Sequence, residues 1–318
     1  MGIISKNISR AVTLLNNEEL VAIPTETVYG LAGNIYSEKA IKLIFETKER
    51  PFFNPLIVHI PSVDYLENIV DEIPEKAKLL VESFWPGPIT LVLKKKDIIP
   101  DLITAGKDTV AVRMPNHSMT LELLRQLDFP LAAPSANPFN RISPTKPEHV
   151  EQYFKNKIKM VLDGGPCVSG IESTIIGFED DQPIIYRLGS TPIEVIENVI
   201  GKIKVKNKKD ISPKAPGMLA RHYAPKTKTI LTKYLLESIK EHQGKRIGLL
   251  IFNDNFNIEN IDFKIVLSQE NNLQEAASNL YDALHQLDEQ ELDIIIAERL
   301  PDYGLGKSIN DRLERATK

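Results

Sequence analysis

Hydrophobic and polar positions recur along the first two hundred residues with two different periods. A period near 3.6 predicts helices at 7–17, 38–46, 74–84, 118–127, 147–154 and 192–200. Short apolar runs predict strands at 20–23, 56–60, 89–94, 110–112, 160–162, 174–176 and 184–187. Because strands and helices intermix without strict alternation, we expect an α/β fold with a mixed, twisted sheet covered by helices. Ser118 is expected to cap the helix that begins there.

The pattern changes after residue 200. Residues 202–214 contain six lysines and little apolar periodicity, which is typical of an exposed connection. From residue 228 the predicted elements alternate: strands at 229–231, 246–252, 263–267 and 292–297, with helices at 235–242, 273–287 and 308–316. This alternation favours a smaller, Rossmann-like α/β layer with a parallel sheet. We therefore expect an N-terminal domain at 1–200, a linker at 201–226 and a C-terminal domain at 227–318.

Composition narrows the class of protein. The 318 residues are 42% hydrophobic and 26% charged, as in globular proteins, and the apolar runs are far shorter than a membrane span. A single cysteine, Cys167, excludes an internal disulfide and fits a reducing cytoplasm, so we expect a cytoplasmic protein and interpret Cys167 as packing. The net charge of -4 argues against a broad nucleic-acid-binding surface, although it allows a local basic cleft.

The sequence contains no metal-ligand cluster, no Gly-x-Ser-x-Gly elbow and no Walker loop. The run at 304–308 superficially resembles the end of a phosphate loop, but it lacks the first glycine at the required spacing. We interpret it as the start of a helix. The remaining candidates are cations and short hydroxyl side chains, which bind and orient a substrate but supply no evident nucleophile.

Two short runs concentrate these candidates. In the run 24–31, Pro24 cannot continue a central strand, so Thr25, Glu26 and Thr27 are expected at a strand end, where binding residues often lie. In the run 48–51, Lys48 and Arg50 stand beside prolines that discourage further helix. We expect both cations on a stiff loop that binds phosphate or carboxylate. A solvated charge cluster beside an ordinary turn is the alternative.

Further runs make the pattern specific. They lie at 84–90 (Phe-Trp-Pro-Gly-Pro-Ile-Thr), 112–115, 134–137 (Pro-Ser-Ala-Asn), 173–175, 187–189, 215–218 and 222–225 (His-Tyr-Ala-Pro). Together with the first two runs, and in this order, they resemble the YrdC/Sua5 family, the threonylcarbamoyl-AMP synthases. The resemblance is strong over residues 1–225, and the remainder looks like the extra domain of the longer, Sua5-type members.

The resemblance implies an activity. Family members join L-threonine, bicarbonate or CO2, and ATP into threonylcarbamoyl-AMP and pyrophosphate, and the product passes to the transferase machinery that makes threonylcarbamoyladenosine (t6A) in tRNA. Mg²⁺ is expected with ATP, held by phosphates and water rather than by protein side chains. A double-stranded RNA-binding module and a related carbamoyl-transfer domain are the alternatives. A weak RNA contact is compatible with the lysine-rich linker.

The resemblance also implies roles for residues. Lys48 and Arg50 are expected to be catalytic and to meet the phosphates. We call the positions expected at ATP the predicted nucleotide set: Arg50, Asn54, Thr109, Ser135, Asn137, Ser143, Arg187 and Tyr223. We call those expected at threonine the predicted threonine set: Thr27, His59, Arg113, Ala133 and Ser173.

Structural roles compete with several of these assignments. His59 could be a satisfied core histidine, and Arg113 could belong to a surface ion pair. Ser135 and Asn137 could be turn formers. We also expect residues 212–225 to pack over the cleft as a lid, with Tyr223 near the nucleotide, because apolar and aromatic side chains there are ill-suited to solvent.

Overall fold

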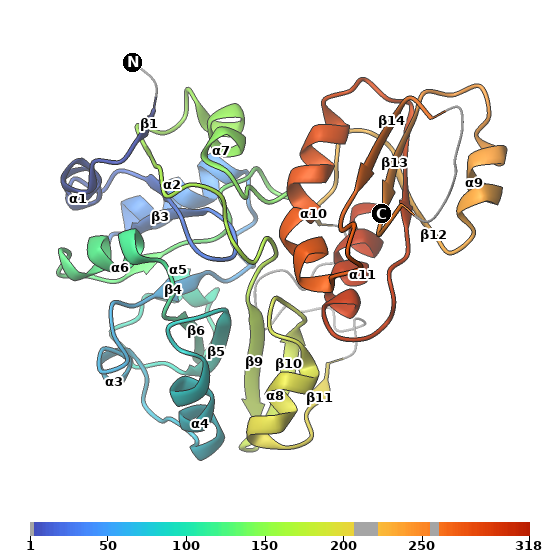
Figure 1. Ribbon diagram of the computed structural model, residues 1–318. Coiled ribbons are helices and arrows are strands. Elements are labelled where there is room, and N and C mark those ends of the chain that lie inside the picture. The colour runs from blue at the N-terminus through green and yellow to red at the C-terminus, as the bar shows by residue number, and fades with distance from the viewer. Residues whose placement is uncertain (1–2, 207–221, 255–260) are drawn as a thin grey trace.

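The computed structural model describes residues 3–206, 222–254 and 261–318. In that part of the chain, the strands form two sheets, one of eleven strands and one of four. Figure 1 shows the two domains side by side, with helices α10 (Leu273–Asp288) and α11 (Leu305–Ala316) between the smaller sheet and the first domain. Within the described residues, no helix is both long and apolar enough to cross a bilayer.

The larger sheet mixes parallel and antiparallel pairs, which confirms the expected fold class. Its strands are β1 (Ile4–Ser5), β2 (Val21–Ile23), β3 (Gly30–Asn34), β4 (Ile57–His59), β5 (Ile89–Lys94), β6 (Thr109–Arg113), β7 (Leu131–Ala132), β8 (Val161–Leu162), β9 (Thr174–Glu179), β10 (Gln182–Arg187) and β11 (Lys204–Val205). Their spatial order is β1-β8-β2-β3-β7-β4-β6-β5-β9-β10-β11. For example, β4 runs parallel to β6, whereas β5 runs antiparallel to β6 and parallel to β9.

Helices of the first domain begin and end at local signals. They are α1 (Ile8–Asn16), α2 (Glu38–Lys48), α3 (Leu66–Ile69), α4 (Glu75–Phe84), α5 (Asp101–Thr104), α6 (Ser118–Arg125), α7 (Pro147–Phe154) and α8 (Ile193–Ile200). The side chains of Asn7 and Ser37 accept backbone N–H bonds at the starts of α1 and α2. Pro147 occupies the first turn of α7, where its missing N–H costs nothing.

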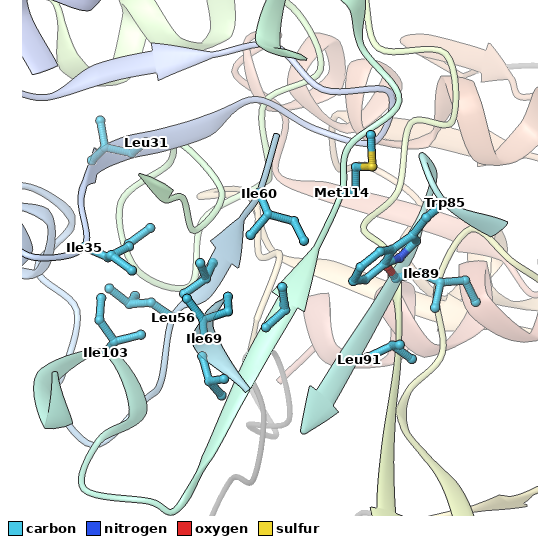
Figure 2. Packing of buried hydrophobic residues seen from close by; sticks show 14 of the residues in the cluster. Leu31, Ile35, Leu56, Ile60, Ile69, Trp85, Ile89, Leu91, Ile103 and Met114 are labelled. Atoms are coloured by element: carbon cyan, nitrogen blue, oxygen red, sulfur yellow. The ribbon is translucent and has the colours of Figure 1, made fainter. Parts of the chain in front are cut away.

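Strand periodicity places the main core and the polar candidates on opposite faces of the sheet. Val58 and Val112 belong to the main core, which α2, α4 and α8 cover. The alternate residues His59 and Arg113 therefore point to the other face. Figure 2 shows part of this core, where Trp85 lies near Ile89 and donates its indole N–H to the Ile89 carbonyl at 2.8 Å.

The second domain is a small parallel α/β layer, as the alternating pattern predicts. Its strands are β12 (Thr229–Thr232), β13 (Ile247–Ile251), β14 (Phe263–Val266) and β15 (Ile294–Glu298), in the order β12-β15-β13-β14. Helix α9 (Leu235–Glu241) covers one face, and α10 and α11 cover the face toward the first domain (Figure 1). The hydrophobic cluster under α10 and α11 also contains Val28, Ile142 and Ile171 of the first domain. The two domains thus share a core.

Four sequence-based expectations need correction. Strand β11 pairs with β10 inside the expected linker, so the first sheet extends beyond residue 200. Lys48 is the last residue of α2 rather than part of a loop. Ser118 is the first residue of α6, and His117 precedes it without a side-chain cap bond. Helix α11 begins at Leu305, earlier than expected, so the run at 304–308 is the start of a helix as interpreted from the sequence. Its Lys307 pairs with Glu194 at 2.7 Å.

Candidate active site

One pocket lies on the sheet face away from the main core, where the first domain meets the second. Side chains and backbone from strand ends and the loops that follow them form its wall: Thr25, Thr27, Val28, Gly30, Arg50, Ile57, His59, Arg113, Ala133, Pro134, Ser135, Glu172, Ser173, Arg187, His222 and Tyr223. The whole predicted threonine set lines it. From the predicted nucleotide set, the lining residues are Arg50, Ser135, Arg187 and Tyr223.

Arg113, the last residue of β6, is held from three sides. Its Nε donates to the carbonyl of Gly87 at 3.2 Å, and its Nη1 donates to Thr27 Oγ1 at 2.9 Å. Its Nη2 lies 2.7 Å from Glu26 Oε1, and the side chain is 4% exposed. These contacts fix the guanidinium in the pocket wall and exclude the interpretation of Arg113 as a surface ion pair. A fixed guanidinium is the group best suited to bind a carboxylate.

His59, at the end of β4, is buried but is not a satisfied core histidine. Its Nδ1 has no hydrogen-bond partner within the described chain. Burial, reinforced by the charge of Arg113, lowers the pKa of His59 to about 3, so the imidazole is neutral at pH 7. A neutral imidazole with an open nitrogen can bond a hydroxyl group.

Ser173 and Arg187 orient one another at the pocket wall. Arg187 donates to the Ser173 carbonyl from Nε at 3.2 Å and from Nη2 at 2.9 Å, and Nη2 also lies 3.1 Å from Ser173 Oγ. Thr90 Oγ1 lies 2.7 Å from the same Oγ. The serine hydroxyl is therefore held in one position next to a cation.

Lys48 and Arg50 are buried cations without a carboxylate partner in the described part of the chain. Lys48 Nζ donates to the carbonyls of Ser135 and Asn137, so Lys48 supports the loop that lines the pocket rather than lining it. Arg50 donates to the carbonyls of Asn54 and Pro55, the latter at 2.8 Å. Burial lowers the pKa of both groups. Uncompensated buried cations are costly, which favours an anion as their natural partner.

Asn54 and Asn137 differ in their surroundings. Asn54 is 0% exposed, and neither its Oδ1 nor its Nδ2 has a partner among the described residues. Asn137 donates to the carbonyls of Pro138 and Arg141 at 2.9 and 3.0 Å, and so stabilises its own turn. Both amide atoms of Asn54 are thus open to a ligand, whereas the Nδ2 of Asn137 has a structural role and only its Oδ1 has no partner among the described residues.

Four members of the predicted nucleotide set are not in the pocket lining: Asn54 and Asn137, described above, and Ser143 and Thr109. Ser143 is fully buried behind the wall, and its Oγ donates to Glu172 Oε1 at 2.6 Å. Thr109 begins β6, so it lies roughly 13 Å along the strand from Arg113 on the same sheet face. Its neighbours there are Lys107 and Phe178. The structure does not bring Thr109 to this pocket.

The segment at 222–225 is pinned between the domains. Residues 212–221 of the expected lid lie outside the described residues. The His222 N–H donates to the Arg315 carbonyl at 3.3 Å, and the Ala224 N–H donates to the Asn140 carbonyl at 2.8 Å. Tyr223 is buried at φ +65°, a region that a non-glycine residue occupies at a cost. Its ring lines the pocket, and its hydroxyl has no partner within the described chain.

Two carboxylates at the site had no role predicted from the sequence: Glu26, which was expected only at a strand end, and Glu172, which was not identified. Glu26 pairs with Arg113, and Glu172 lines the pocket. Each stands next to a residue expected to bind threonine, Thr27 or Ser173. That adjacency is the signal that could have found them, because a buried binding group needs fixed neighbours.

Fold and pocket together define a class: a two-domain α/β protein with a pocket whose wall holds the fixed, buried guanidinium of Arg113 together with Arg50 and Arg187. Two family models match the chain. One, Sua5_yciO_yrdC, described as "Telomere recombination", matches residues 13–189. The other, Sua5_C, described as "Threonylcarbamoyl-AMP synthase, C-terminal domain", matches residues 191–317. The chain belongs to the YrdC/Sua5 family, in its longer Sua5 form, which confirms the resemblance seen in the sequence.

Similar proteins cover nearly the whole chain. The threonylcarbamoyl-AMP synthase of Pyrococcus abyssi is 41% identical, over 96% of this chain and 93% of that protein. The threonylcarbamoyl-AMP synthase of Bacillus subtilis is 43% identical, over 97% and 92%. The crystal structure of P. abyssi Sua5 complexed with L-threonine matches with a TM-score of 0.91 and 40% identity, over 99% of this chain and 96% of that one.

Proposed function

We propose that this chain is an enzyme that forms threonylcarbamoyl-AMP and pyrophosphate from L-threonine, bicarbonate or CO2, and ATP. One observation carries the proposal. The buried cations Lys48 and Arg50 lack a carboxylate partner in the described chain, and Arg50 lines the same pocket as Arg113. One pocket can thus bind a polyanion and an amino-acid carboxylate together. The relatives named threonylcarbamoyl-AMP synthase support this function.

Threonine is expected to bind through its two polar ends. Arg113 would bind the carboxylate, because Thr27 and Glu26 hold its guanidinium in place. The neutral imidazole of His59 and the hydroxyl of Ser173 would recognise the substrate hydroxyl. The P. abyssi structure complexed with L-threonine supports threonine as the amino acid.

The reaction needs no nucleophile from the protein. The threonine amine attacks the carbon of CO2 and forms the C–N bond, while one C=O π bond breaks and its electron pair moves to oxygen. The nitrogen loses a proton to water or bicarbonate, which gives the carbamate. A carbamate oxygen then attacks the α-phosphorus of ATP, and the α–β phosphoanhydride bond breaks with its electron pair leaving on pyrophosphate. Cys167 is no competitor, because burial raises the pKa of its thiol and it lies outside the pocket lining.

The residues of this chain would contribute to catalysis by positioning the substrates and by supplying positive charge. Arg50 and Arg187 line the pocket where the negative charge of the phosphates would develop, and Lys48 holds the backbone at 135–137. Fixed cations in a dry site stabilise that charge without reorganisation. Holding two substrates in contact supplies further rate acceleration.

Mg²⁺ is proposed to enter with ATP. Glu172 is the acidic side chain in the pocket lining, and Tyr281 and Arg312 already bind its carboxylate. Within the described residues no cluster of three or more metal-ligating side chains is present, so phosphates and water would have to supply most ligands of the ion. The ion would neutralise phosphate charge. We further propose that the product passes to the transferase that makes t6A in tRNA.

The test is an omission experiment on the purified chain. Pyrophosphate release from ATP should require both L-threonine and bicarbonate, and the adenylate should appear by mass spectrometry. Valine should release pyrophosphate at least tenfold more slowly than threonine, because it leaves the hydroxyl-binding groups unpaired. Release that is independent of either co-substrate would contradict the proposal.

A further inference from the structure

The carboxylate of Glu172 joins the pocket to the second domain. It accepts hydrogen bonds from Ser143 Oγ at 2.6 Å, from Tyr281 of α10 at 2.9 Å and from Arg312 Nε of α11 at 3.1 Å. Two of these three donors thus come from the C-terminal domain, although Glu172 itself lines the pocket in the N-terminal domain. Nothing in the sequence pattern links α10 or α11 to the chemistry.

The same two helices hold Tyr223. The Arg312 guanidinium lies 5.3 Å from the centre of the Tyr223 ring, and the Tyr281 ring stacks on it at 5.6 Å. Arg312 is 0% exposed, so these contacts exclude water. Tyr223 and Glu172, two neighbouring parts of the pocket wall, are therefore both fixed from the C-terminal side. Figure 1 shows α10 and α11 facing the first domain.

The backbone near Glu172 is fitted closely to α10. Gly170 adopts φ +69°, and a side chain there would come within 2.4 Å of the Ser278 backbone. Ser308 of α11 donates to the Gly189 carbonyl at 2.8 Å, close to Arg187 in the chain. Because Gly170 has no side chain, the loop at 170–173 can lie directly against the backbone of α10. The position of the C-terminal domain therefore determines the position of Glu172.

Protonation states agree with these donors. Burial, reinforced by the Glu172 charge, raises the pKa of Tyr281 well above its usual value, so the phenol keeps the proton that it donates. Burial alone would raise the pKa of Glu172, but the charges of Arg312 and Arg187 lower it below its usual value. Glu172 is thus an anion that the positive charge of Arg312 stabilises.

We propose that Tyr281 and Arg312 are positioning residues for the reaction, and that through them the C-terminal domain is part of the active site. The inference rests on the proposed function. If Glu172 loses a donor from the C-terminal side, its charge is compensated less and is drawn toward Arg187, whose guanidinium then leaves Ser173. Tyr223 loses its support in the same step. The nucleotide side of the pocket is affected first, because Arg187 and Tyr223, which line the pocket, belong to the predicted nucleotide set.

The experiment compares Tyr281→Phe with Tyr153→Phe in the full-length chain. Both substitutions remove one tyrosine hydroxyl near the domain interface. Tyr281 donates to Glu172, whereas Tyr153 donates to the Ile142 carbonyl at 3.2 Å, and its ring lies 5.7 Å from that of His285. Arg312 is completely buried, so its truncation could prevent folding. Tyr281→Phe is therefore the main test, and Arg312→Lys is measured second.

The readout is KM for ATP and for threonine, from pyrophosphate release at 25 °C, with thermal unfolding measured in parallel. Tyr281→Phe should raise KM for ATP about tenfold or more, which is the contribution of a hydrogen bond to a charged group. It should raise KM for threonine by a smaller factor, because Ser173 loses its contact with Arg187. Tyr153→Phe should change neither more than twofold. Arg312→Lys, which keeps the charge but not the fork, should also raise KM for ATP.

The proposal is overturned if Tyr281→Phe keeps the KM values of the unmodified chain. It is also overturned if both tyrosine variants lose activity only in proportion to thermal stability, because that would be a purely structural interface. Failure of the proposed function looks different. In that case the unmodified chain itself releases no pyrophosphate in response to threonine and bicarbonate.

Discussion

At the scale of single residues, unpaired buried groups distinguish binding from folding. Asn54 is completely buried with both amide atoms unpartnered in the described chain, so it lowers stability in the absence of a ligand. Asn54→Leu, which is nearly isosteric, should raise the free energy of unfolding by about 1–2 kcal/mol. The same variant should raise KM for ATP about tenfold. Urea unfolding and pyrophosphate release measure the two effects.

Asn137→Leu is the matched control for that prediction. Its amide donates to the Pro138 and Arg141 carbonyls, so its loss should lower the free energy of unfolding by about 1–3 kcal/mol. The two asparagines thus change stability in opposite directions. If Asn54→Leu destabilises the chain as much as Asn137→Leu does, Asn54 is a structural residue and not a ligand contact.

The sequence predicted residue types well but not their partners. Arg113 and Ser173 were identified from short runs, and both line the pocket. Lys48 was predicted on a loop, because Pro51 discourages helix in its neighbourhood. Helix α2 nevertheless continues to Lys48. Tyr281 and Arg312 were not identified at all. Their contacts with Glu172 join residues more than one hundred positions apart, and such pairing carries no local signal.

At the scale of elements, helix α2 ends at a residue whose backbone conformation favours glycine. Glu49 caps the helix with φ +55° and ψ +37°, the left-handed region in which glycine carries no steric cost. Its side chain reaches Lys157 only through an exposed ion pair, which contributes little. Glu49→Gly should therefore raise the free energy of unfolding by up to about 1 kcal/mol. Thermal unfolding of the purified variant measures this.

Glu46→Gly tests the same argument with the opposite sign. Glu46 is exposed and lies inside α2, where glycine costs about 1 kcal/mol in helix propensity. Both variants lose one exposed carboxylate at the same helix, so the difference between them reports mainly backbone conformation, since the Glu49–Lys157 ion pair contributes little. Equal destabilisation by the two substitutions would show that Glu49 is not strained.

The bounds of helices and strands were predicted correctly where the hydrophobic periodicity extends over several residues. They were not predicted where tertiary packing determines the structure. Strand β5 and helix α7 have the bounds expected from the sequence. Strand β3 was missed, because its two glycines weaken any strand signal. Gly33 nevertheless fits closely, since a side chain there would come within 3.1 Å of Leu20 and 3.2 Å of Ile44, and those side chains would have to shift. Such a constraint is visible only in the packed sheet.

At the scale of the whole molecule, the two domains are joined through buried polar groups as well as a shared core. The ring of His285 on α10 stacks on that of His149 on α7 at 3.9 Å, and one ring nitrogen lies 3.3 Å from the Ser143 carbonyl. The other charged groups at this contact are Lys146 and Asp282, which pair at 2.7 Å. Residues of both domains therefore surround an imidazole that must stay neutral.

Because of the buried His285 imidazole, we expect the free energy of unfolding to decrease in acid. Burial, with the neighbouring His149, lowers the pKa of His285 to about 3 from its ordinary 6.5. Between these two values the unfolded chain binds a proton that the folded chain does not, so stability falls as pH drops below 6.5. From pH 7.5 to 5.0 this one group should cost about 2 kcal/mol.

The prediction is tested by removing the imidazole. His285→Gln keeps a polar group near the Ser143 carbonyl but cannot titrate, so its loss of unfolding free energy between pH 7.5 and 5.0 should be about 2 kcal/mol smaller than that of the unmodified chain. His59 and His222, whose pKa values burial also lowers, remain in both proteins and cancel in the comparison. The pKa of Asp282 is lowered, chiefly by its hydrogen bond with His149, so it titrates below this window. Urea titrations at the two pH values supply the four free energies, and parallel pH dependence of the two proteins would show that His285 does not control the acid response.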